Sequence, residues 1–292
     1  MKRVCYFNIG YSCNNACVYC FSISTGKENK NLSFEDFKEV VQLFNPTEND
    51  KIIINGGEPT IHPLFYDMLT FINQQYSTSI VVYSNGISID ETKITSIRNL
   101  TFVIPIHGYT TSHDAITRHS GSFSATLSTL KKLQKKNIDY SIKFIVNKSM
   151  VEEEFNIASF LESNVLSPSK IFIARLNATK KSRDNDVQYP SLREIKYFVQ
   201  KNHQELKGRL AIVYLDLPFC LLPISSFDTN KNEIPDFYFT DYKEKFKNCL
   251  YYKQLLIRRQ KCQECEYRKY CLTMEKSYLT VVFENSWDMD LE

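Results

Sequence analysis

The stretch Tyr11-Ser12-Cys13-Asn14-Asn15-Ala16-Cys17-Val18-Tyr19-Cys20-Phe21 places three cysteines, spaced C-x3-C-x2-C, on one short loop after an apolar N-terminal run. Three thiols cannot all pair with one another, so this spacing favours a metal site over a disulfide cluster. An iron–sulfur cube bound by only three cysteines keeps one iron open for a substrate or cofactor, since each protein-bound iron takes its own thiolate. The alternative is a zinc loop completed by a distant residue.

Length and composition indicate an ordinary globular protein. The 292 residues, 43% hydrophobic and 24% charged, fit one large α/β domain with an appendage or two small domains. A net charge of +3 is too small to indicate nucleic-acid or membrane partners. The N-terminal apolar run is too short for a signal peptide, and no run approaches the ~18 apolar residues of a membrane span. We therefore expect a cytoplasmic protein.

The nine cysteines fall into two groups, which predicts two separate metal centres. A disulfide framework is not expected in the cytoplasm. Cys5 stands apart, on a predicted strand, and is expected in the core. The N-terminal group is Cys13, Cys17 and Cys20, and the C-terminal group is Cys220, Cys249, Cys262, Cys265 and Cys271.

Short β-branched runs alternate with longer amphipathic segments, a pattern typical of βα units around a parallel sheet. We expect strands at 4–9, 51–55, 79–83, 101–106, 140–146 and 170–175. We expect helices at 33–44, 63–76, 90–98, 122–136, 151–163 and 191–206. Six units are too few for a closed eight-unit barrel, but they suit an open partial barrel or a doubly wound sheet.

The pattern changes after residue 206. A strand is expected at 209–215, followed by a turn-rich segment, a polar linker at 225–233, an aromatic stretch at 237–239 and the cysteine-rich tail. We therefore predict two domains, 1–207 and 208–292.

Two glycine-containing loops follow the second and third predicted strands. Gly56-Gly57-Glu58-Pro59 comes first, and its paired glycines would let the backbone approach a ligand closely. Ser84-Asn85-Gly86 comes next, and alone it would indicate only a turn. Both loops should lie at the carboxyl ends of the strands, where ligands bind in parallel α/β sheets.

In this order and spacing, the cysteine loop, the GGEP loop and the Ser-Asn-Gly loop resemble the radical S-adenosylmethionine (SAM) superfamily. The resemblance implies a partial (β/α)6 barrel and a [4Fe–4S] cluster on Cys13, Cys17 and Cys20 whose open iron chelates SAM. It also implies SAM-binding roles for Tyr19, for Gly56, Gly57, Glu58 and Pro59 beside the amino group, and for Ser84 and Asn85 near the carboxylate or ribose.

A further block resembles peptide- and cofactor-modifying members of that superfamily. It contains Ile106-His107-Gly108-Tyr109, then His113-Asp114 and Gly121-Ser122-Phe123. His107 is the catalytic candidate in the pocket, while His113 and Asp114 are expected to order the following loop. Asn147 and Arg175, at the ends of the fifth and sixth strands, are expected to contact SAM or substrate. The alternative for both is a helix-capping or surface residue.

The tail carries Cys262, Cys265 and Cys271 as C-x2-C-x5-C, a spacing that fits zinc and an iron–sulfur cluster equally well. After a radical SAM-like barrel it resembles the auxiliary-cluster region of the SPASM and Twitch subfamilies. Position 275 is Glu, so ligands for two extra cubes are lacking. The resemblance implies one auxiliary [4Fe–4S] cluster, with Cys220 as the expected fourth ligand and Cys249 as the alternative.

The resemblance implies an enzyme that cleaves SAM reductively to a 5′-deoxyadenosyl radical, which abstracts a substrate hydrogen. The expected function is maturation of a ribosomally made peptide by crosslinking, thioether formation or epimerisation, with flavodoxin or ferredoxin as reductant. A cysteine loop that begins at residue 13 leaves no room before it for the leader-binding domain of many maturases. The alternatives are a small-molecule dehydrogenase acting on a sugar or amino alcohol, and a non-catalytic zinc or electron-transfer protein.

Overall fold

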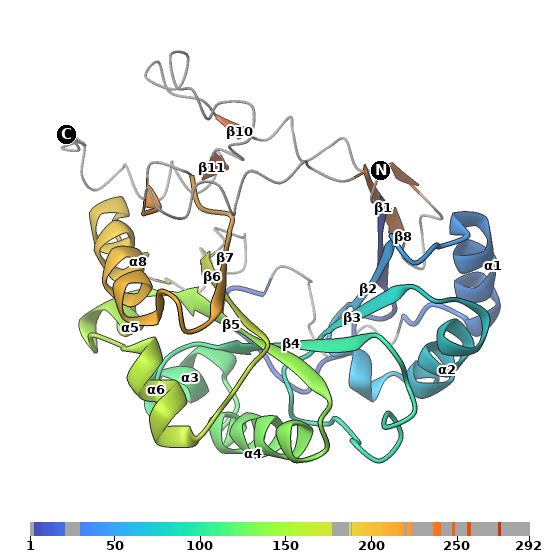
Figure 1. The fold of residues 1–292 in the computed structure, drawn as a ribbon, viewed down its shortest axis with the longest axis horizontal. Coiled ribbons are helices and arrows are strands. Elements are labelled where there is room, and N and C mark those ends of the chain that lie inside the picture. Colours follow the sequence, from blue (N-terminus) through green and yellow to red (C-terminus); the bar gives the residue numbers. More distant parts are fainter. Residues whose placement is uncertain are drawn as a thin grey trace.

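The computed structural model describes residues 3–20, 30–176, 187, 189–218, 221–223, 236–240, 247–248, 256–257 and 274–275. Its main feature is a nine-stranded sheet that curves into an arc with helices on the outside (Figure 1). The strands are β1 (Arg3–Asn8), β2 (Lys51–Asn55), β3 (Ser79–Tyr83), β4 (Leu100–Ile106), β5 (Asp139–Val146), β6 (Lys170–Arg175), β7 (Ala211–Leu215), β8 (Asp236–Thr240) and β9 (Lys247–Asn248). A separate antiparallel pair joins β10 (Leu256–Ile257) to β11 (Met274–Glu275).

The strand order decides between the two folds that the sequence left open. Strands β1 to β7 lie side by side in sequence order and pair in parallel. A doubly wound sheet reverses its order at a switch point, and this sheet does not. Among the described strands the sheet ends at β7 and β9 rather than closing. The fold is therefore a partial (β/α)6-type barrel, as expected.

Helices cover the outer face of the arc, where every second side chain of a strand packs against them. On β2, Ile52 and Ile54 are fully buried, and they belong to the same core as Phe37 and Leu69 of the neighbouring helices. The helices are α1 (Phe34–Phe44), the 3₁₀ turn η1 (Pro59–Ile61), α2 (Phe65–Gln75), α3 (Thr110–Thr117), α4 (Ser122–Lys135), α5 (Lys148–Glu152), α6 (Ile157–Asn164) and α8 (Leu192–Leu206). Ser33 caps α1 as its sequence position predicts, by accepting a hydrogen bond from the Asp36 amide at 3.0 Å.

One predicted helix is wrong, and a second is interrupted. The segment 90–98 forms turns, because the Asp90 carboxylate accepts hydrogen bonds from the backbone and hydroxyl of Thr92 and so competes with a helix. The segment 151–163 is divided between α5 and α6. Glu154 has a φ of 48°, which no α-helix allows, so the helix is interrupted between α5 and α6. Asn156 then caps α6.

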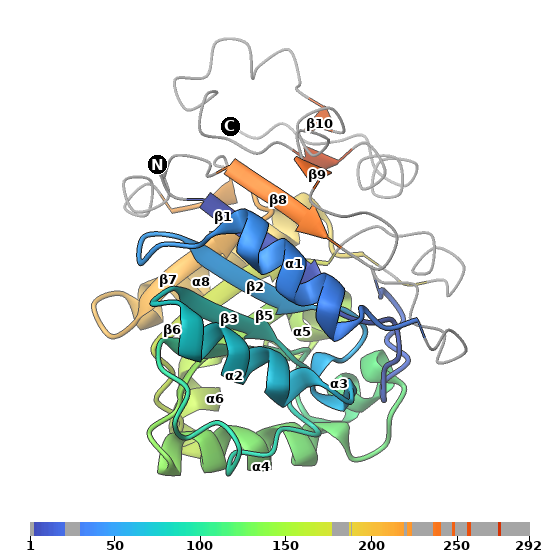
Figure 2. The ribbon, with the colours of Figure 1, turned by 90° about the vertical axis from the view of Figure 1, so that its right-hand side faces the viewer.

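The segment after residue 206 extends the sheet at both edges. The predicted strand at 209–215 is β7, which pairs in parallel with β6. The aromatic stretch at 237–239 lies in β8, which pairs in parallel with β1 (Figure 2). The boundary at residue 207/208 and the auxiliary-cluster domain stay predictions. No described helix combines the length and the apolar character needed to cross a membrane.

Candidate functional site

The loops after β1 and β2 lie back to back at the carboxyl edge of the sheet. The Gly57 amide donates to the Gly10 carbonyl at 2.8 Å, and the Glu58 amide donates to the Ser12 carbonyl at 2.8 Å. These bonds extend the pairing of β1 with β2 into the loops. The GGEP loop therefore supports the first half of the cysteine loop directly.

The paired glycines are explained by this contact. A Cβ atom on Gly57 would lie 2.1 Å from the Ser12 carbonyl oxygen, and one on Gly56 would lie 2.4 Å from the Gly10 carbonyl oxygen. The sequence suggested that these glycines allow a ligand to approach the backbone. In the structure, the backbone that approaches them is that of the cysteine loop.

Glu58 joins the GGEP loop to the loop after β3. Its buried carboxylate accepts four hydrogen bonds: from the amide and hydroxyl of Thr60 at 3.1 and 2.6 Å, from the Ser84 hydroxyl at 2.7 Å and from the Asn85 amide at 2.7 Å. Burial raises the pKa of the Glu58 carboxyl, and these hydrogen bonds oppose that shift. The predicted residues Glu58, Ser84 and Asn85 therefore form one connected unit.

Asn85 in turn reaches the cysteine loop. Its side-chain amide donates to Asn14 Oδ1 at 2.6 Å and lies 4.0 Å from Cys13 Sγ, while its Oδ1 accepts from the Ile87 amide at 2.9 Å. The Asn15 amide also donates to Cys13 Sγ, at 3.4 Å. Amide hydrogens aimed at a cysteine sulfur are typical of iron–sulfur sites, where they tune the cluster.

The second half of the cysteine loop rests on α3, a helix absent from the sequence prediction. The Ala16 and Val18 amides donate to the carbonyls of Thr117 and Ile116 at 3.0 and 2.9 Å. His119 Nδ1 lies 2.9 Å from the Asn14 carbonyl oxygen. No motif pointed to this support, because it joins segments about a hundred residues apart.

Asp114 shapes the turn after α3, as expected. Its carboxylate accepts hydrogen bonds from the Gly121 amide, the Ser122 hydroxyl and the Phe123 amide at 2.6, 2.9 and 2.8 Å. These three residues begin α4. The prediction that Asp114 orders the following loop is confirmed.

Tyr19 of the cysteine loop contacts His107, the residue that follows β4. Tyr19 Oη lies 2.9 Å from His107 Nε2, and the His107 side chain is 1% exposed. Burial raises the pKa of Tyr19, as does negative charge on Cys17 and Cys20. Burial lowers the pKa of His107 well below its usual range, with help from positive charge on His113 and Lys143. Both groups are therefore neutral near pH 7, so the phenol can donate to the imidazole.

The last two predicted contact residues use their polar atoms within the protein. Asn147 caps α5 through the Met150 amide at 3.1 Å, and its Nδ2 donates to the His107 carbonyl at 2.9 Å. Arg175 is 3% exposed, and its Nε donates to the Asp216 carbonyl at 2.8 Å. Asn147 matches the helix-capping alternative, whereas Arg175 is not a surface residue. A contact of either with SAM stays a prediction.

The cysteine loop offers the ligand set of an iron–sulfur cluster, three cysteines on one loop. Cys13, Cys17 and Cys20 are present as thiols. Across the described part of the chain, no three His, Cys, Asp or Glu side chains converge on a point where one ion would bind. A cube takes each thiolate on a different iron, so its three sulfurs need not converge. Cys220, Cys249, Cys262, Cys265 and Cys271 lie outside the described residues.

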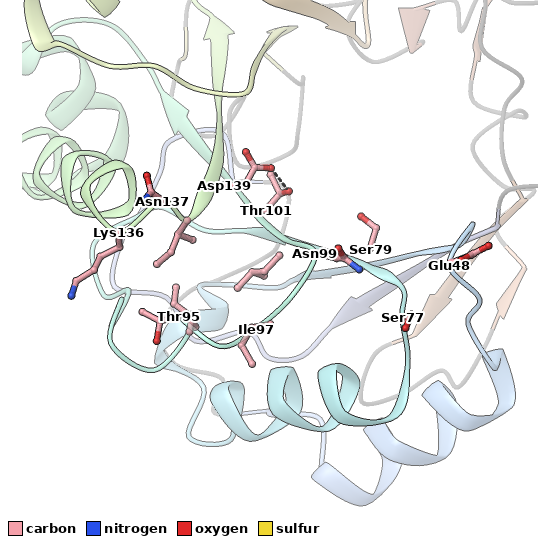
Figure 3. Close-up of a pocket in the computed structure, with 13 residues that line it drawn as sticks. Glu48, Ser77, Ser79, Thr95, Ile97, Asn99, Thr101, Lys136, Asn137 and Asp139 are labelled. Carbon is pink, nitrogen blue, oxygen red and sulfur yellow. Dashed lines mark hydrogen bonds between the residues drawn. The ribbon is translucent and has the colours of Figure 1, made fainter.

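A cavity of about 650 Å³ lies at the opposite end of the barrel (Figure 3). Its lining includes Ser79, Thr101 and Asp139, near the amino ends of β3, β4 and β5. Parallel barrels bind their ligands at the carboxyl ends of the strands. This cavity is therefore not the candidate site.

Comparison with known proteins agrees with the geometry. Residues 7–156 match the Radical SAM superfamily family model. The sporulation killing factor maturation protein SkfB of Bacillus subtilis (strain 168) is 25% identical over 152 residues, which cover 51% of this chain and 37% of SkfB. The mycofactocin maturase MftC of Mycobacterium tuberculosis is 26% identical over 130 residues, 44% of this chain and 33% of MftC. The match thus spans about a third of each of these relatives.

Solved structures share the fold. Streptococcus suis SuiB, bound to its precursor peptide SuiA, superposes with a TM-score of 0.72 at 12% identity, covering 96% of this chain and 73% of SuiB. The structure of anSMEcpe with bound AdoMet superposes with a TM-score of 0.71 at 14% identity, covering 98% of this chain and 88% of anSMEcpe. The family match includes the cysteine, GGEP and Ser-Asn-Gly loops and their common support. The chain therefore belongs to the radical SAM superfamily.

Proposed function

We propose that this protein is a radical SAM enzyme that modifies a peptide. One observation carries the proposal: the three-cysteine loop is held, backbone to backbone, by the GGEP loop at the carboxyl edge of a parallel partial barrel. That loop continues through Glu58 to Asn85, whose amide lies beside Cys13.

When bound, a [4Fe–4S] cluster with SAM supplies one-electron cleavage of SAM and a radical able to abstract hydrogen. Cys13, Cys17 and Cys20 would hold the cluster, and Gly56 to Pro59, Ser84 and Asn85 would line the SAM site. The described residues contribute position rather than acid–base chemistry. His107, which is buried and neutral, holds Tyr19 beside the cysteines through the 2.9 Å contact. We therefore assign His107 a positioning role in place of the catalytic one suggested by the sequence.

A peptide is the favoured substrate. SkfB is named a maturation protein and MftC a maturase, and SuiB is bound to a precursor peptide. These names favour a peptide over a sugar or amino alcohol. In this proposal one auxiliary [4Fe–4S] cluster on Cys262, Cys265, Cys271 and either Cys220 or Cys249 exchanges electrons with the substrate. Flavodoxin or ferredoxin supplies the first electron in the cytoplasm, where thiols stay reduced.

The test is anaerobic reconstitution with iron and sulfide, followed by SAM and dithionite. We expect 5′-deoxyadenosine from the wild type and at least about a thousandfold less from Cys17→Ala, because the cluster loses a ligand. Cys5→Ala is the matched control: Cys5 is fully buried in the core, and burial raises the pKa of its thiol to about 12, so it should not bind iron. Cleavage of SAM by Cys17→Ala at the wild-type rate would refute the proposal.

The peptide assignment has its own test. The reconstituted protein is incubated with SAM, dithionite and short peptides encoded beside its gene, and the products are analysed by mass spectrometry. A mass loss of about two hydrogens, or an epimer detected after hydrolysis in deuterated solvent, would support peptide maturation. Conversion of a sugar or amino alcohol, with every such peptide unchanged, would support the small-molecule alternative.

A further inference from the structure

Lys143 places a positive charge on the inner face of the barrel. Its neighbours on β5, Ile142 and Phe144, are fully buried in the core beneath the helices. Side chains alternate along a strand, so Lys143 faces the other way, into the concave side of the arc seen in Figure 1. Its register partners are Pro105 on β4 and Phe172 on β6, neither of which has an acidic group.

The ammonium group of Lys143 lies against an aromatic ring rather than a carboxylate. Nζ is 5.8 Å from the ring centroid of Tyr83, which ends β3 two strands away. Among the residues that the structure describes, no carboxylate oxygen lies within 4.0 Å of Nζ. Lys143 is partly buried, and a charge held partly away from water is costly unless an opposite charge joins it. The site therefore has a cation and an aromatic wall, but no carboxylate of the described residues lies within ion-pair distance of the cation.

Asp216 is the acidic residue whose charge acts on this site, and it lies beyond ion-pair distance of Lys143. Burial lowers the pKa of Lys143, and the negative charge of Asp216 at the end of β7 opposes that shift without forming an ion pair. Burial, together with Asp216, raises the pKa of Tyr83 to about 12. Tyr83 is therefore a neutral phenol, able to donate a hydrogen bond to an incoming anion. His107, a further titratable group near Lys143, is neutral as well.

We propose that Lys143 and Tyr83 form a subsite in the barrel that binds a carboxylate of the substrate, such as an acidic side chain of a peptide. This inference rests on the proposed function, because it names the substrate chemistry of the same site. The competing source of a carboxylate is SAM itself. The SAM-lining loops follow β1 to β3, whereas Lys143 lies on β5, three residues before that strand ends. This position favours the substrate.

The experiment uses N-acetyl-L-glutamate α-amide as the probe and N-acetyl-L-glutamine α-amide as its neutral control. Binding to the reconstituted, SAM-loaded protein is followed by saturation-transfer-difference NMR, which needs no turnover. We expect the glutamate probe to bind more tightly than the glutamine probe. Lys143→Met, which keeps the aliphatic stem, should weaken binding of the glutamate probe by at least about tenfold, as expected when a charged hydrogen bond is lost. Lys143→Arg should retain most of the binding.

Two further measurements decide the source of the carboxylate. Lys170→Met is the matched control, because Lys170 begins β6 at the opposite end of the barrel and should not affect the probe. The dissociation constants of SAM and decarboxylated SAM are measured for each variant. If Lys143→Met weakens the binding of SAM by the same factor and leaves the binding of decarboxylated SAM unchanged, Lys143 binds the carboxylate of SAM. The proposal is then wrong. Equal binding of both probes, or of the glutamate probe to wild type and Lys143→Met, would also overturn it. Cleavage of SAM by the wild type tests the proposed function separately.

Discussion

The loops after β1 to β3 and the inner face of β4 to β6 use their polar groups in opposite ways. In the first region, backbone meets backbone, and the buried carboxylate of Glu58 has four internal donors. In the second, Lys143 carries a charge that no described carboxylate within 4.0 Å neutralises. The hydrogen bonds of the Glu58 carboxylate are complete before any ligand arrives, whereas the negative charge that acts on Lys143, that of Asp216, forms no ion pair with it.

This difference suggests a division of labour. A cluster and its SAM need one exact geometry, which rigid backbone contacts and saturated hydrogen bonds can hold. A substrate site needs a group whose interactions are satisfied only when the substrate is present. On this view the β1–β3 side supports the shared chemistry, and the β4–β6 side selects what is modified.

The largest expected effect comes from Gly57→Ala. Its Cβ would lie 2.1 Å from the Ser12 carbonyl oxygen, so one of the two loops must move. We expect the free energy of unfolding to fall by roughly 3 kcal/mol, and reconstituted iron per chain to fall with it. Urea denaturation followed by circular dichroism, together with iron analysis, measures both. Gly208→Ala is the control: it meets no atom within 4 Å and should cost only about 1 kcal/mol for its φ of 77°. Wild-type iron in Gly57→Ala would show that the loops are not rigidly coupled.

A smaller loss is expected from Glu58→Gln. The amide nitrogen replaces one acceptor oxygen, so at least one of the buried donors loses its partner. We expect a loss of about 2 kcal/mol in stability and about tenfold in 5′-deoxyadenosine formation at pH 7. Glu48→Gln, on the exposed surface at the other end of the barrel, should change stability by less than about 0.5 kcal/mol. If both variants behave alike, Glu58 does not link the loops.

The smallest effect is expected from Asn147→Ala, which tests whether Asn147 does more than cap α5. Asn147→Ala and Asn156→Ala each remove a helix cap, so each should cost about 1 kcal/mol in thermal or urea unfolding. Only Asn147 also donates to the His107 carbonyl. We therefore expect a fall in 5′-deoxyadenosine formation for Asn147→Ala alone. Equal rates of 5′-deoxyadenosine formation in the two variants would show that Asn147 acts only as a helix cap.

Much of the β1–β3 side was predictable because it is encoded locally. The C-x3-C-x2-C spacing, the GGEP loop and the Ser-Asn-Gly loop each lie within a few residues, directly after a strand whose β-branched pattern is plain. Parallel strands place those loops at one edge whatever the remaining contacts are. The six-unit partial barrel followed from the same alternation together with the family resemblance.

The sequence by itself determined the class of fold, the three-cysteine loop and its two companion loops, because short-range patterns carry them. Only the tertiary structure decided the strand order, the support of the cysteine loop by α3, the pairing of Tyr19 with His107 and the position of Lys143 over Tyr83. Each of these depends on contacts between segments that are distant in sequence. Such contacts arise from the packing of the whole barrel, and no local spacing encodes them.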